Sequence, residues 1–236
     1  MLTNAKKIIS LVLYPVGMII LPLIFTLIAV LVSDNGIEQL LNGDDQSLLI
    51  IPSVISYAIL CVVLVIITFG VFKQDLKKIK SWGNFALQMV LGLVATFSMA
   101  LIGGTLVTLL GESDTALNQQ LVEDALMAMP FLMILTAVFF GPIVEEIIFR
   151  LVLMKLFPKW KPVYNIIFSS LIFGAMHVLV GGWIHIIPYF LMGAVFGYIY
   201  YKNDNIWHAT VLHILHNGAT VGLVFLAQGL LETLPY

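Results

Sequence analysis

The stretch GPIVEEIIFRLVL, residues 141–153, places Glu145, Glu146 and Arg150 inside a long apolar segment. A charge at membrane depth costs roughly 2.5–3.5 kcal/mol on insertion scales, so a membrane helix that keeps three of them has a use for them. The whole chain is 61% hydrophobic and only 10% charged, whereas soluble domains are about 45–50% apolar and 25% charged. This composition predicts an integral membrane protein in contact with the lipid bilayer. The small number of basic residues argues against nucleic acid as a partner.

Seven apolar stretches are long enough to cross a hydrocarbon core of about 30 Å, which takes about 20 helical residues. We predict an all-α bundle of seven transmembrane helices at residues 8–32, 48–72, 84–110, 126–156, 163–180, 183–201 and 206–230. The fourth stretch would be about 46 Å long at 1.5 Å per residue, so it tilts, protrudes or breaks near Pro142. A break there would make eight helices. One membrane domain is expected over residues 1–236, with amino-terminal helices in 1–125 and a helical core in 126–230.

All eleven basic residues lie at one end of the predicted bundle, whereas the loops of the other end, 33–47 and 111–125, are acidic and contain no Lys or Arg. Cytoplasmic loops collect Lys and Arg, so the amino terminus is predicted to be cytoplasmic. With seven spans the carboxyl terminus lies on the other side. No cleavable signal, lipid anchor or transit peptide is recognised, so we expect a multi-pass protein of the cell membrane.

The three charged residues of the opening stretch differ in their spacing. Glu146 and Arg150 are four residues apart with the acid first, which is the favoured arrangement for an ion pair on a helix. Glu145 points about 100° away and has no partner in its own helix. Two adjacent carboxylates beside one arginine repel each other, which favours protonation of the less well paired one. A partly desolvated carboxylate that accepts a proton is what general base catalysis requires.

Other polar residues of the second half lie on the fifth and seventh predicted helices. His213 and Asn217 are four residues apart and share one helical face, and His177 lies on the fifth helix. A carboxylate, two imidazoles and an amide could together activate water and stabilise an oxyanion. Each group also has a structural interpretation as an ion pair or as a hydrogen bond between helices. We expect His216 to face elsewhere, and His185 and His208 to lie near the ends of spans, where an imidazole needs no functional explanation.

Three motifs in this half resemble those of a known family. EEIIFR (145–150), FGAMH (173–177) and HILHN (213–217) match the EExxxR, FxxxH and HxxxN motifs of the CAAX protease and bacteriocin-processing family in order and helix context. These are intramembrane endopeptidases that include the type II CAAX prenyl endopeptidases. The resemblance covers roughly residues 126–220, so it makes 126–230 the catalytic core, whereas the first three helices are only generically similar.

The resemblance implies roles for four residues. Glu145 and His177 would hold and activate the attacking water, and His213 and Asn217 would stabilise the oxyanion of the tetrahedral intermediate. The family is commonly called metalloprotease, although its chemistry is also described as glutamate-dependent without metal. Glu145, His177 and His213 could form a zinc site with an open position for water, but HExxH is absent and no ligand spacing is diagnostic. We favour a glutamate-activated water, with a divalent metal as the alternative.

The resemblance also implies supporting residues. The Glu146–Arg150 pair would hold the shape of the site, and Phe173 would pack beneath His177. One departure from the family pattern is Leu151, where many members carry Gly after the arginine; it affects packing at the cytoplasmic end. Counted along their helices, the catalytic residues lie at different depths, so the helices must tilt or be offset. Water must reach them through a polar cavity, which we expect to open at the cytoplasmic face.

Three functional hypotheses follow. The first is an intramembrane endopeptidase acting on a peptide or membrane-associated protein, such as a bacteriocin leader, a signalling peptide or a prenylated CaaX-like tail. By analogy with the family, the compact chain resembles a bacterial member in the plasma membrane. The second is a non-catalytic immunity or scaffold protein of the same family. The third is an ion-coupled transporter, which would be expected to have paired halves with interrupted helices that this sequence does not show.

Overall fold

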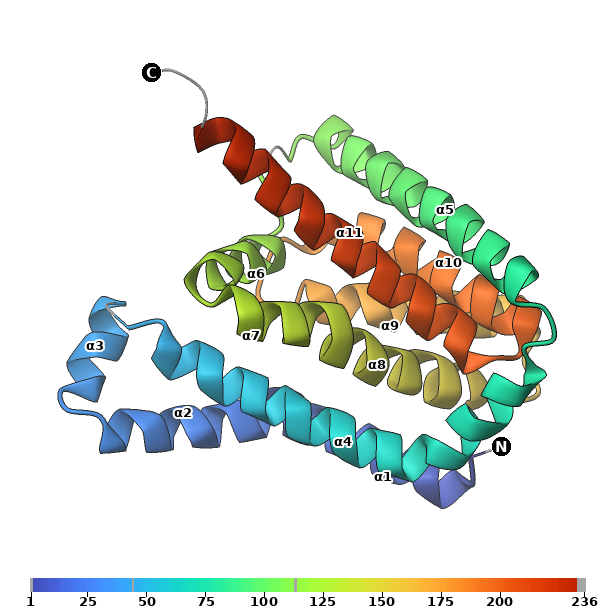
Figure 1. The fold of residues 1–236 in the computed structure, drawn as a ribbon, viewed down its shortest axis with the longest axis horizontal. Coiled ribbons are helices and arrows are strands. Elements are labelled where there is room, and N and C mark those ends of the chain that lie inside the picture. Colours follow the sequence, from blue (N-terminus) through green and yellow to red (C-terminus); the bar gives the residue numbers. More distant parts are fainter. Residues whose placement is uncertain (1, 44, 113, 233–236) are drawn as a thin grey trace.

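The computed structural model describes residues 2–43, 45–112 and 114–232, and these ranges form helices joined by short loops (Figure 1). Backbone polar groups find no water inside a bilayer, and a helix satisfies them within one segment. The long helices are α1 (Asn4–Pro15) and α2 (Leu21–Val32), which are joined by the π-helical turn η1 (Val16–Ile20), and α4 (Ser47–Lys78), α5 (Trp82–Leu109), α9 (Pro162–His177), α10 (Ile186–Asn203) and α11 (Ile206–Glu232). The shorter elements are α3 (Gly36–Asn42), α6 (Leu117–Ala128), α7 (Pro130–Ile134), η2 (Leu135–Phe140), α8 (Gly141–Glu146), η3 (Ile147–Val152), η4 (Leu153–Lys155) and η5 (Trp183–His185).

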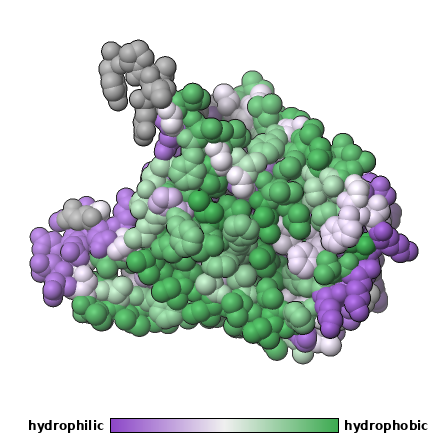
Figure 2. Space-filling view, viewed as in Figure 1, coloured by the Kyte–Doolittle hydropathy of each residue, from purple (hydrophilic) through white to green (hydrophobic). Residues whose placement is uncertain are grey.

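Six helical segments of the described ranges are long and apolar enough to cross a membrane, and α9 is a shorter apolar helix of 16 residues. The six are Asn4–Val32, Ser47–Lys78, Trp82–Leu109, Pro130–Lys155, Trp183–Asn203 and Ile206–Leu230. Together with α9 they correspond to the seven predicted stretches, which confirms the all-helical membrane fold. Apolar side chains cover the middle of the molecule and hydrophilic ones gather at its two ends (Figure 2), as a bilayer requires.

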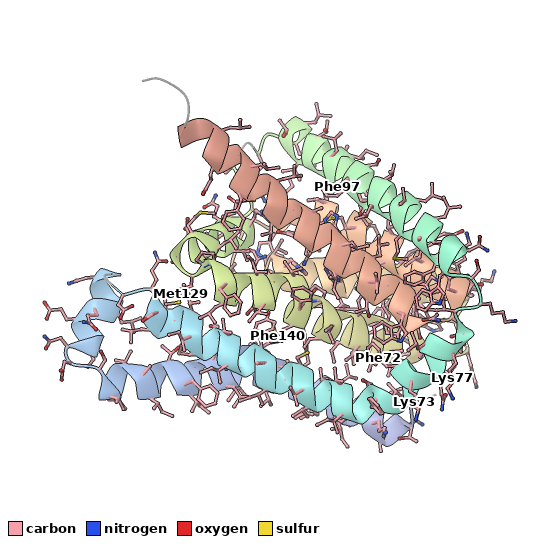
Figure 3. All side chains as sticks on the ribbon, in the orientation of Figure 1. Phe72, Lys73, Lys77, Phe97, Met129 and Phe140 are labelled. Carbon is pink, nitrogen blue, oxygen red and sulfur yellow. The ribbon has the colours of Figure 1, made fainter. Side chains whose placement is uncertain are left out.

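The fourth predicted helix is where structure and prediction differ most. The chain breaks between α6 and α7 at Met129, which has φ −141° and ψ 69° and directly precedes Pro130 (Figure 3). Proline pushes the residue before it out of the helical region. At Pro142 the chain stays helical, because the π-helical turn η2 comes directly before it and adjusts the hydrogen-bond ladder. Of the alternatives for this stretch, a break is present, but it lies at Met129 and not near Pro142. It separates α6 from α7.

The amino-terminal helices and the core share one packed interior. Helix α5 lies close along α10 and α11, because glycines let the backbones approach. A methyl group at Gly103 would lie 2.5 Å from the Cα of Pro188, and one at Gly92 would lie 2.7 Å from a methyl carbon of Leu212. The main cluster of buried apolar side chains draws on both parts of the chain, among them Tyr14, Leu60, Met89, Phe149, Phe173, Phe196 and Leu212.

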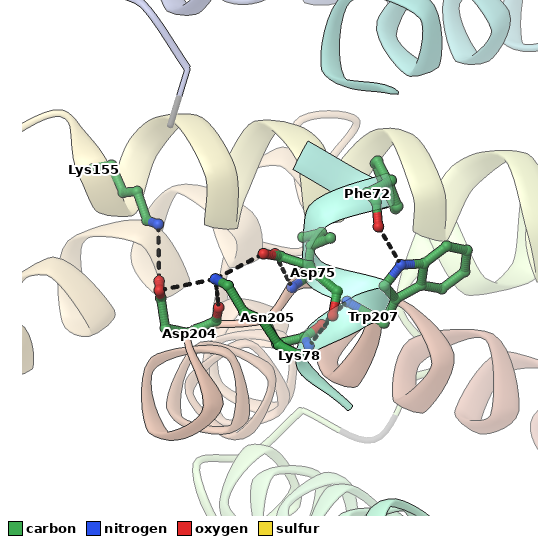
Figure 4. Close-up of polar contacts among 8 residues, drawn as sticks. Phe72, Asp75, Lys78, Lys155, Asp204, Asn205 and Trp207 are labelled. Atoms are coloured by element: carbon green, nitrogen blue, oxygen red, sulfur yellow. Dashed lines mark hydrogen bonds and ion pairs between the residues drawn. The ribbon is translucent and has the colours of Figure 1, made fainter. Parts of the chain in front are cut away.

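A polar network, which we call the clasp, ties three segments together at the basic end of the bundle (Figure 4). It consists of Asp75, Lys78, Lys155, Asp204 and Asn205. The Lys78 ammonium lies 2.8 Å from Asp75 Oδ1 and 3.2 Å from Asp204 Oδ2, and the Lys155 ammonium lies 3.0 Å from Asp204 Oδ1. The clasp joins the end of α4, the end of η4 and the α10–α11 loop.

The clasp also determines where α11 begins. The backbone N–H of Ile206, at the start of α11, donates to Asp75 Oδ2 at 3.0 Å, and the Asn205 amide donates to the Asp75 carbonyl at 2.7 Å. The indole N–H of Trp207 donates to the Phe72 carbonyl at 2.8 Å (Figure 4). Unpaired N–H groups at a helix start need such acceptors. Helix α11 carries two of the predicted site residues, so the clasp sets their position.

Candidate active site

The predicted site residues come from three neighbouring segments of the core. Glu145 and Glu146 end α8, Arg150 lies on η3, Phe173 and His177 on α9, and His213 and Asn217 on α11. Helix α11 runs obliquely across α8 and α9 instead of parallel to them (Figure 1). This crossing lets residues counted at different depths along their helices meet at one place, as the sequence required.

Glu146 is the centre of a buried charged network. The carboxylate, fully buried, accepts from Arg150 Nε at 2.9 Å through Oε2 and contacts His213 Nδ1 at 3.0 Å through Oε1. Arg150 also donates from a terminal nitrogen to Ser169 Oγ at 2.9 Å, and Ser169 donates to the Phe149 carbonyl at 2.7 Å. The ion pair expected from the four-residue spacing is therefore present. Its third member, His213, could not be inferred from spacing alone.

The network determines which nitrogen of His213 carries a proton. Glu146 is paired with the Arg150 guanidinium as a carboxylate, so its Oε1 can only accept, and His213 Nδ1 carries the hydrogen that lies between them. The other ring nitrogen, Nε2, is then left facing Glu145, whose Oε2 lies 3.7 Å away. Neutral His213 offers an acceptor at Nε2, and its imidazolium form offers a donor there.

Glu145 contrasts with its neighbour. Its side chain is 14% exposed, whereas that of Glu146 is 0% exposed, and it borders a cavity of about 690 Å³. Within the described residues its only ion-pair contact is the 3.7 Å approach to His213. The same cavity is lined by His177, His213 and Asn217, so the structure brings all four predicted catalytic residues to one space.

His177 is oriented by its own helix. Its Nδ1 lies 2.8 Å from the Phe173 carbonyl, one turn earlier. A carbonyl can only accept, so Nδ1 carries the hydrogen and Nε2 keeps its lone pair. The ring packs between Phe173, at 4.5 Å between ring centres, and Tyr189, which stacks on it at 4.5 Å. The expected packing of Phe173 against His177 is present.

Asn217 is held by the π-helical turn η2. Its amide nitrogen donates to the Ala137 carbonyl at 2.8 Å. A side-chain amide has two N–H donors, so one remains after this bond is made. Because Asn217 lines the cavity one turn beyond His213, their shared helical face points into the same space, as their spacing predicts.

One of three other histidines differs from expectation. His216 also lines the cavity, where it packs against Phe97 of α5 (Figure 3) at 4.7 Å between ring centres, so it does not face elsewhere. His185 and His208 lie in the first turn of a membrane-spanning segment, near the ends of spans as predicted. Both are buried: His185 Nε2 lies 2.9 Å from the Asp114 carbonyl, and His208 packs against Phe85.

The cavity opens toward the acidic end of the bundle. Beyond the site it is lined by the first turns of α4 and by α6. Exposed residues of this part are Leu49 on α4 and Leu121 and Asp124 on α6. Both segments adjoin the loops that lack Lys and Arg. The expectation of a cavity open at the basic end is therefore wrong. The basic end is instead closed by the clasp.

Two tyrosines of the amino-terminal helices complete the wall near Glu145. Tyr14 of α1 and Tyr57 of α4 line the same cavity as Glu145. Neither tyrosine was predicted, because no motif marks them and their helices resemble the family only generically. A tyrosine within an apolar span is the one available signal, since its hydroxyl needs a polar neighbour when buried.

The proposed metal ligands do not assemble. Within the described ranges, no group of three or more His, Cys, Asp or Glu side chains lies close enough together to hold a metal ion. In this geometry Glu145, His177 and His213 do not fit a zinc site, which needs three protein ligands at about 2 Å from one point.

Two comparisons place the chain among known proteins. Residues 127–219 match the family profile described as type II CAAX prenyl endopeptidase Rce1-like. The chain is 32% identical over 169 residues to the Bacillus subtilis (strain 168) protein named "Putative membrane peptidase YdiL", and the match covers 70% of this chain and 68% of that protein. No solved structure matches the chain.

The matched residues contain each of the three motifs, and the relative covers most of the chain, including helices before the core. The resemblance noted in the sequence is thereby confirmed at the level of the family. This chain belongs to the CAAX protease and bacteriocin-processing family of intramembrane peptidases, the family of the type II CAAX prenyl endopeptidases.

Proposed function

We propose that this protein is an intramembrane endopeptidase in which Glu145 activates a water molecule against a peptide bond. The observation that carries the proposal is the difference between two adjacent glutamates. Glu146 is buried and held by Arg150 and His213, whereas Glu145 faces a cavity and contacts no Lys or Arg among the described residues. A carboxylate with free lone pairs beside an open space can accept a proton from water.

The reaction follows from the hydrogen-bonding capacity of each group. A water molecule in the cavity donates one hydrogen to Glu145 and is oriented by the lone pair of His177 Nε2. Glu145 takes a proton as the water oxygen bonds to the carbonyl carbon of the substrate. The C–N bond then breaks, and the same proton passes from Glu145 to the leaving nitrogen. The products are a new carboxyl terminus and a new amine.

The oxyanion of the intermediate requires donors. Asn217 has one N–H left after its bond to Ala137, and His213 can donate from Nε2 only as the imidazolium, because Nδ1 already donates to Glu146. Preorganised donors of this kind act on charge that develops in the transition state. In this role Glu146 and Arg150 are positioning residues that act through His213.

The substrates we propose are peptides or membrane-associated proteins, such as a bacteriocin leader, a signalling peptide or a CaaX-like tail. We also propose that the amino terminus is cytoplasmic, because every basic residue lies at that end of the bundle. Since the cavity extends to the acidic end, substrates would then enter from the external half of the membrane.

The test is quantitative mass spectrometry of new peptide termini in membranes and medium of cells that express the wild type or Glu145→Gln at matched levels. We expect termini that are present with the wild type and absent with the variant. Glu38→Gln is the matched control, because Glu38 is exposed on α3 and does not line the cavity. It should release the same termini as the wild type.

Two results would contradict the proposal. If Glu145→Gln inserts, accumulates and still releases the same termini, then Glu145 is not the base. If neither protein changes any terminus while the wild type has a measurable phenotype, a binding or immunity role replaces catalysis.

A further inference from the structure

The cavity that holds Glu145 continues past the site to α6. There it is lined by Asn118, Gln119, Glu123 and Asp124, and it also meets Gln46 and Ser53 of α4. We call this part of the cavity the acidic entrance. Much of the remaining wall is apolar, with Met18, Ile50, Val54, Met133, Val221 and Val224 among its residues. An extended, mostly apolar chain would fit such a wall better than a compact polar one.

Tyr189 links the acidic entrance to the site. Its side chain lines the same cavity as Asn118, Glu123 and Glu145. Its ring stacks on His177 at 4.5 Å between centres. A substrate held beside His177 therefore passes Tyr189 and reaches the field of Glu123 on the same path.

The charge of this path is one-sided. The lining contains the carboxylates of Glu123, Asp124 and Glu145 and no Lys or Arg. Glu123 accepts from the Gln119 amide at 2.7 Å. Neither Glu123 nor Asp124 forms an ion pair with any described residue. Arg150 is paired with Glu146, and the other basic residues lie at the opposite end of the bundle, so no Lys or Arg of the described residues lines the entrance.

A second group in the same cavity also lacks a partner. His216 is 7% exposed and lines the cavity, and its Nδ1 finds no hydrogen-bond partner among the described residues. One ring nitrogen of a neutral imidazole donates and the other accepts, so His216 leaves a polar group in the cavity wall without a partner in the chain. The carboxylates of the entrance call for hydrogen-bond donors or positive charge, and they repel an anion.

We propose that the substrate is an extended apolar segment with a Lys or Arg on the side of the scissile bond that faces α6. It brings no free carboxylate to the acidic entrance, because no Lys or Arg lines the cavity to receive one. The inference rests on the proposed function and adds its substrate class. It favours a cationic internal site of a peptide over a tail that ends in a free carboxyl group.

The test uses the full-length protein in liposomes and a set of synthetic peptides with one apolar core and blocked ends. Each peptide carries a single Lys, Gln or Glu at one end or the other, and one further Gln peptide has a free terminal carboxylate. At the end that faces α6, Lys should raise kcat/KM up to about fivefold over Gln, the size of an exposed ion pair, and Glu should lower it. The free carboxylate should also slow cleavage.

Charge reversal assigns the effect to the entrance. The double variant Glu123→Lys, Asp124→Lys should prefer the Glu peptide over the Lys peptide. The neutral pair Glu123→Gln, Asp124→Asn, which adds no buried charge, should remove the preference. Glu38→Lys reverses a charge on the same end of the bundle but outside the cavity, and should leave the order unchanged.

The outcomes separate the two proposals. Cleavage that depends on Glu145 but is equal for Lys, Gln and Glu at both ends would overturn the substrate class and leave the peptidase standing. The same holds if Glu38→Lys shifts the order as much as the entrance variants do. If wild type and Glu145→Gln cut none of the peptides, the substrate class fails together with the proposed function.

Discussion

In the clasp, at the basic end of the bundle, Asp75 and Asp204 each contact a lysine within 3.2 Å, and Asp75 also caps α11. At the other end, Glu123, Asp124 and Glu145 line a cavity and contact no Lys or Arg among the described residues. The carboxylates of the clasp use their hydrogen-bonding capacity within the protein. The carboxylates of the cavity keep lone pairs that are available to a molecule that enters it. The paired carboxylates stabilise the packing of helices, and we propose that the unpaired ones lie where substrate binds and reacts.

The same difference recurs within the site on a smaller scale. Glu146 is fully buried and contacts Arg150 and His213, whereas Glu145, the residue before it, faces the cavity. Replacing members of each set should therefore separate effects on stability from effects on catalysis.

The largest effect is expected from Arg150→Met. This change leaves Glu146 as a buried carboxylate without its cation, which should lower the free energy of unfolding by about 3–5 kcal/mol. Unfolding in detergent micelles, followed by circular dichroism with denaturant or heat, measures the loss. Glu145→Gln should unfold like the wild type.

A double variant makes this prediction sharper. Glu146→Leu with Arg150→Met removes both charges and should regain much of the lost stability, because an apolar pair can replace a buried ion pair. It should remain inactive, because His213 loses the acceptor on Nδ1. Normal activity in the double variant would show that the pair does not position His213.

The next effect is expected from Asn217→Ala, which removes a proposed oxyanion donor. Its kcat should fall about 10²–10³-fold with little change in KM, the size typical of one such donor. The Asn217 amide also bonds to a carbonyl of η2, so a loss of about 1 kcal/mol in stability is expected. Peptide cleavage by the purified protein and thermal unfolding measure the two effects separately.

Ser98→Ala is the control for the loss of stability that follows from a lost hydrogen bond to a backbone carbonyl. Ser98 on α5 donates to the Val94 carbonyl at 2.7 Å outside the cavity, so this variant loses a bond to a backbone carbonyl without losing a donor in the site. If Asn217→Ala keeps kcat within about threefold of the wild type, the amide only supports η2 and is no oxyanion donor.

The sequence predicts the features that depend on short spacing. Hydropathy gives the spans, the four-residue separation gives the Glu146–Arg150 pair, and three motifs give the family. Features that depend on packing between distant segments are missed. The sequence around Asp75 suggests a basic loop. In the structure α4 continues to Lys78, and the Asp75 carboxylate accepts from the backbone N–H of Ile206. The predicted direction of the cavity was wrong for the same reason. Helix α6 lines the opening, and it is a separate helix only because the chain breaks at Met129.

The smallest effect is expected at Asp204, the most exposed acid of the clasp. Burial raises its pKa, but hydrogen bonds and charges of Lys155 and Lys78 outweigh this, so the pKa lies below the ordinary value of 3.8. The unfolded chain therefore binds the proton more readily. The contribution of Asp204 is present above pH 3.8 and is lost as the pH falls further.

The thermal midpoint in micelles should drop slightly more between pH 6 and pH 3 for the wild type than for Asp204→Asn. The Asp204 side chain is 68% exposed, so solvent and salt screen its ion pairs. A salt concentration of 1 M should therefore remove most of the difference between wild type and variant. Glu38→Gln, which replaces an exposed acid without an ion pair in the described chain, should follow the wild type. Equal pH dependence of wild type and Asp204→Asn at low salt would mean that the clasp depends on Asp75 alone.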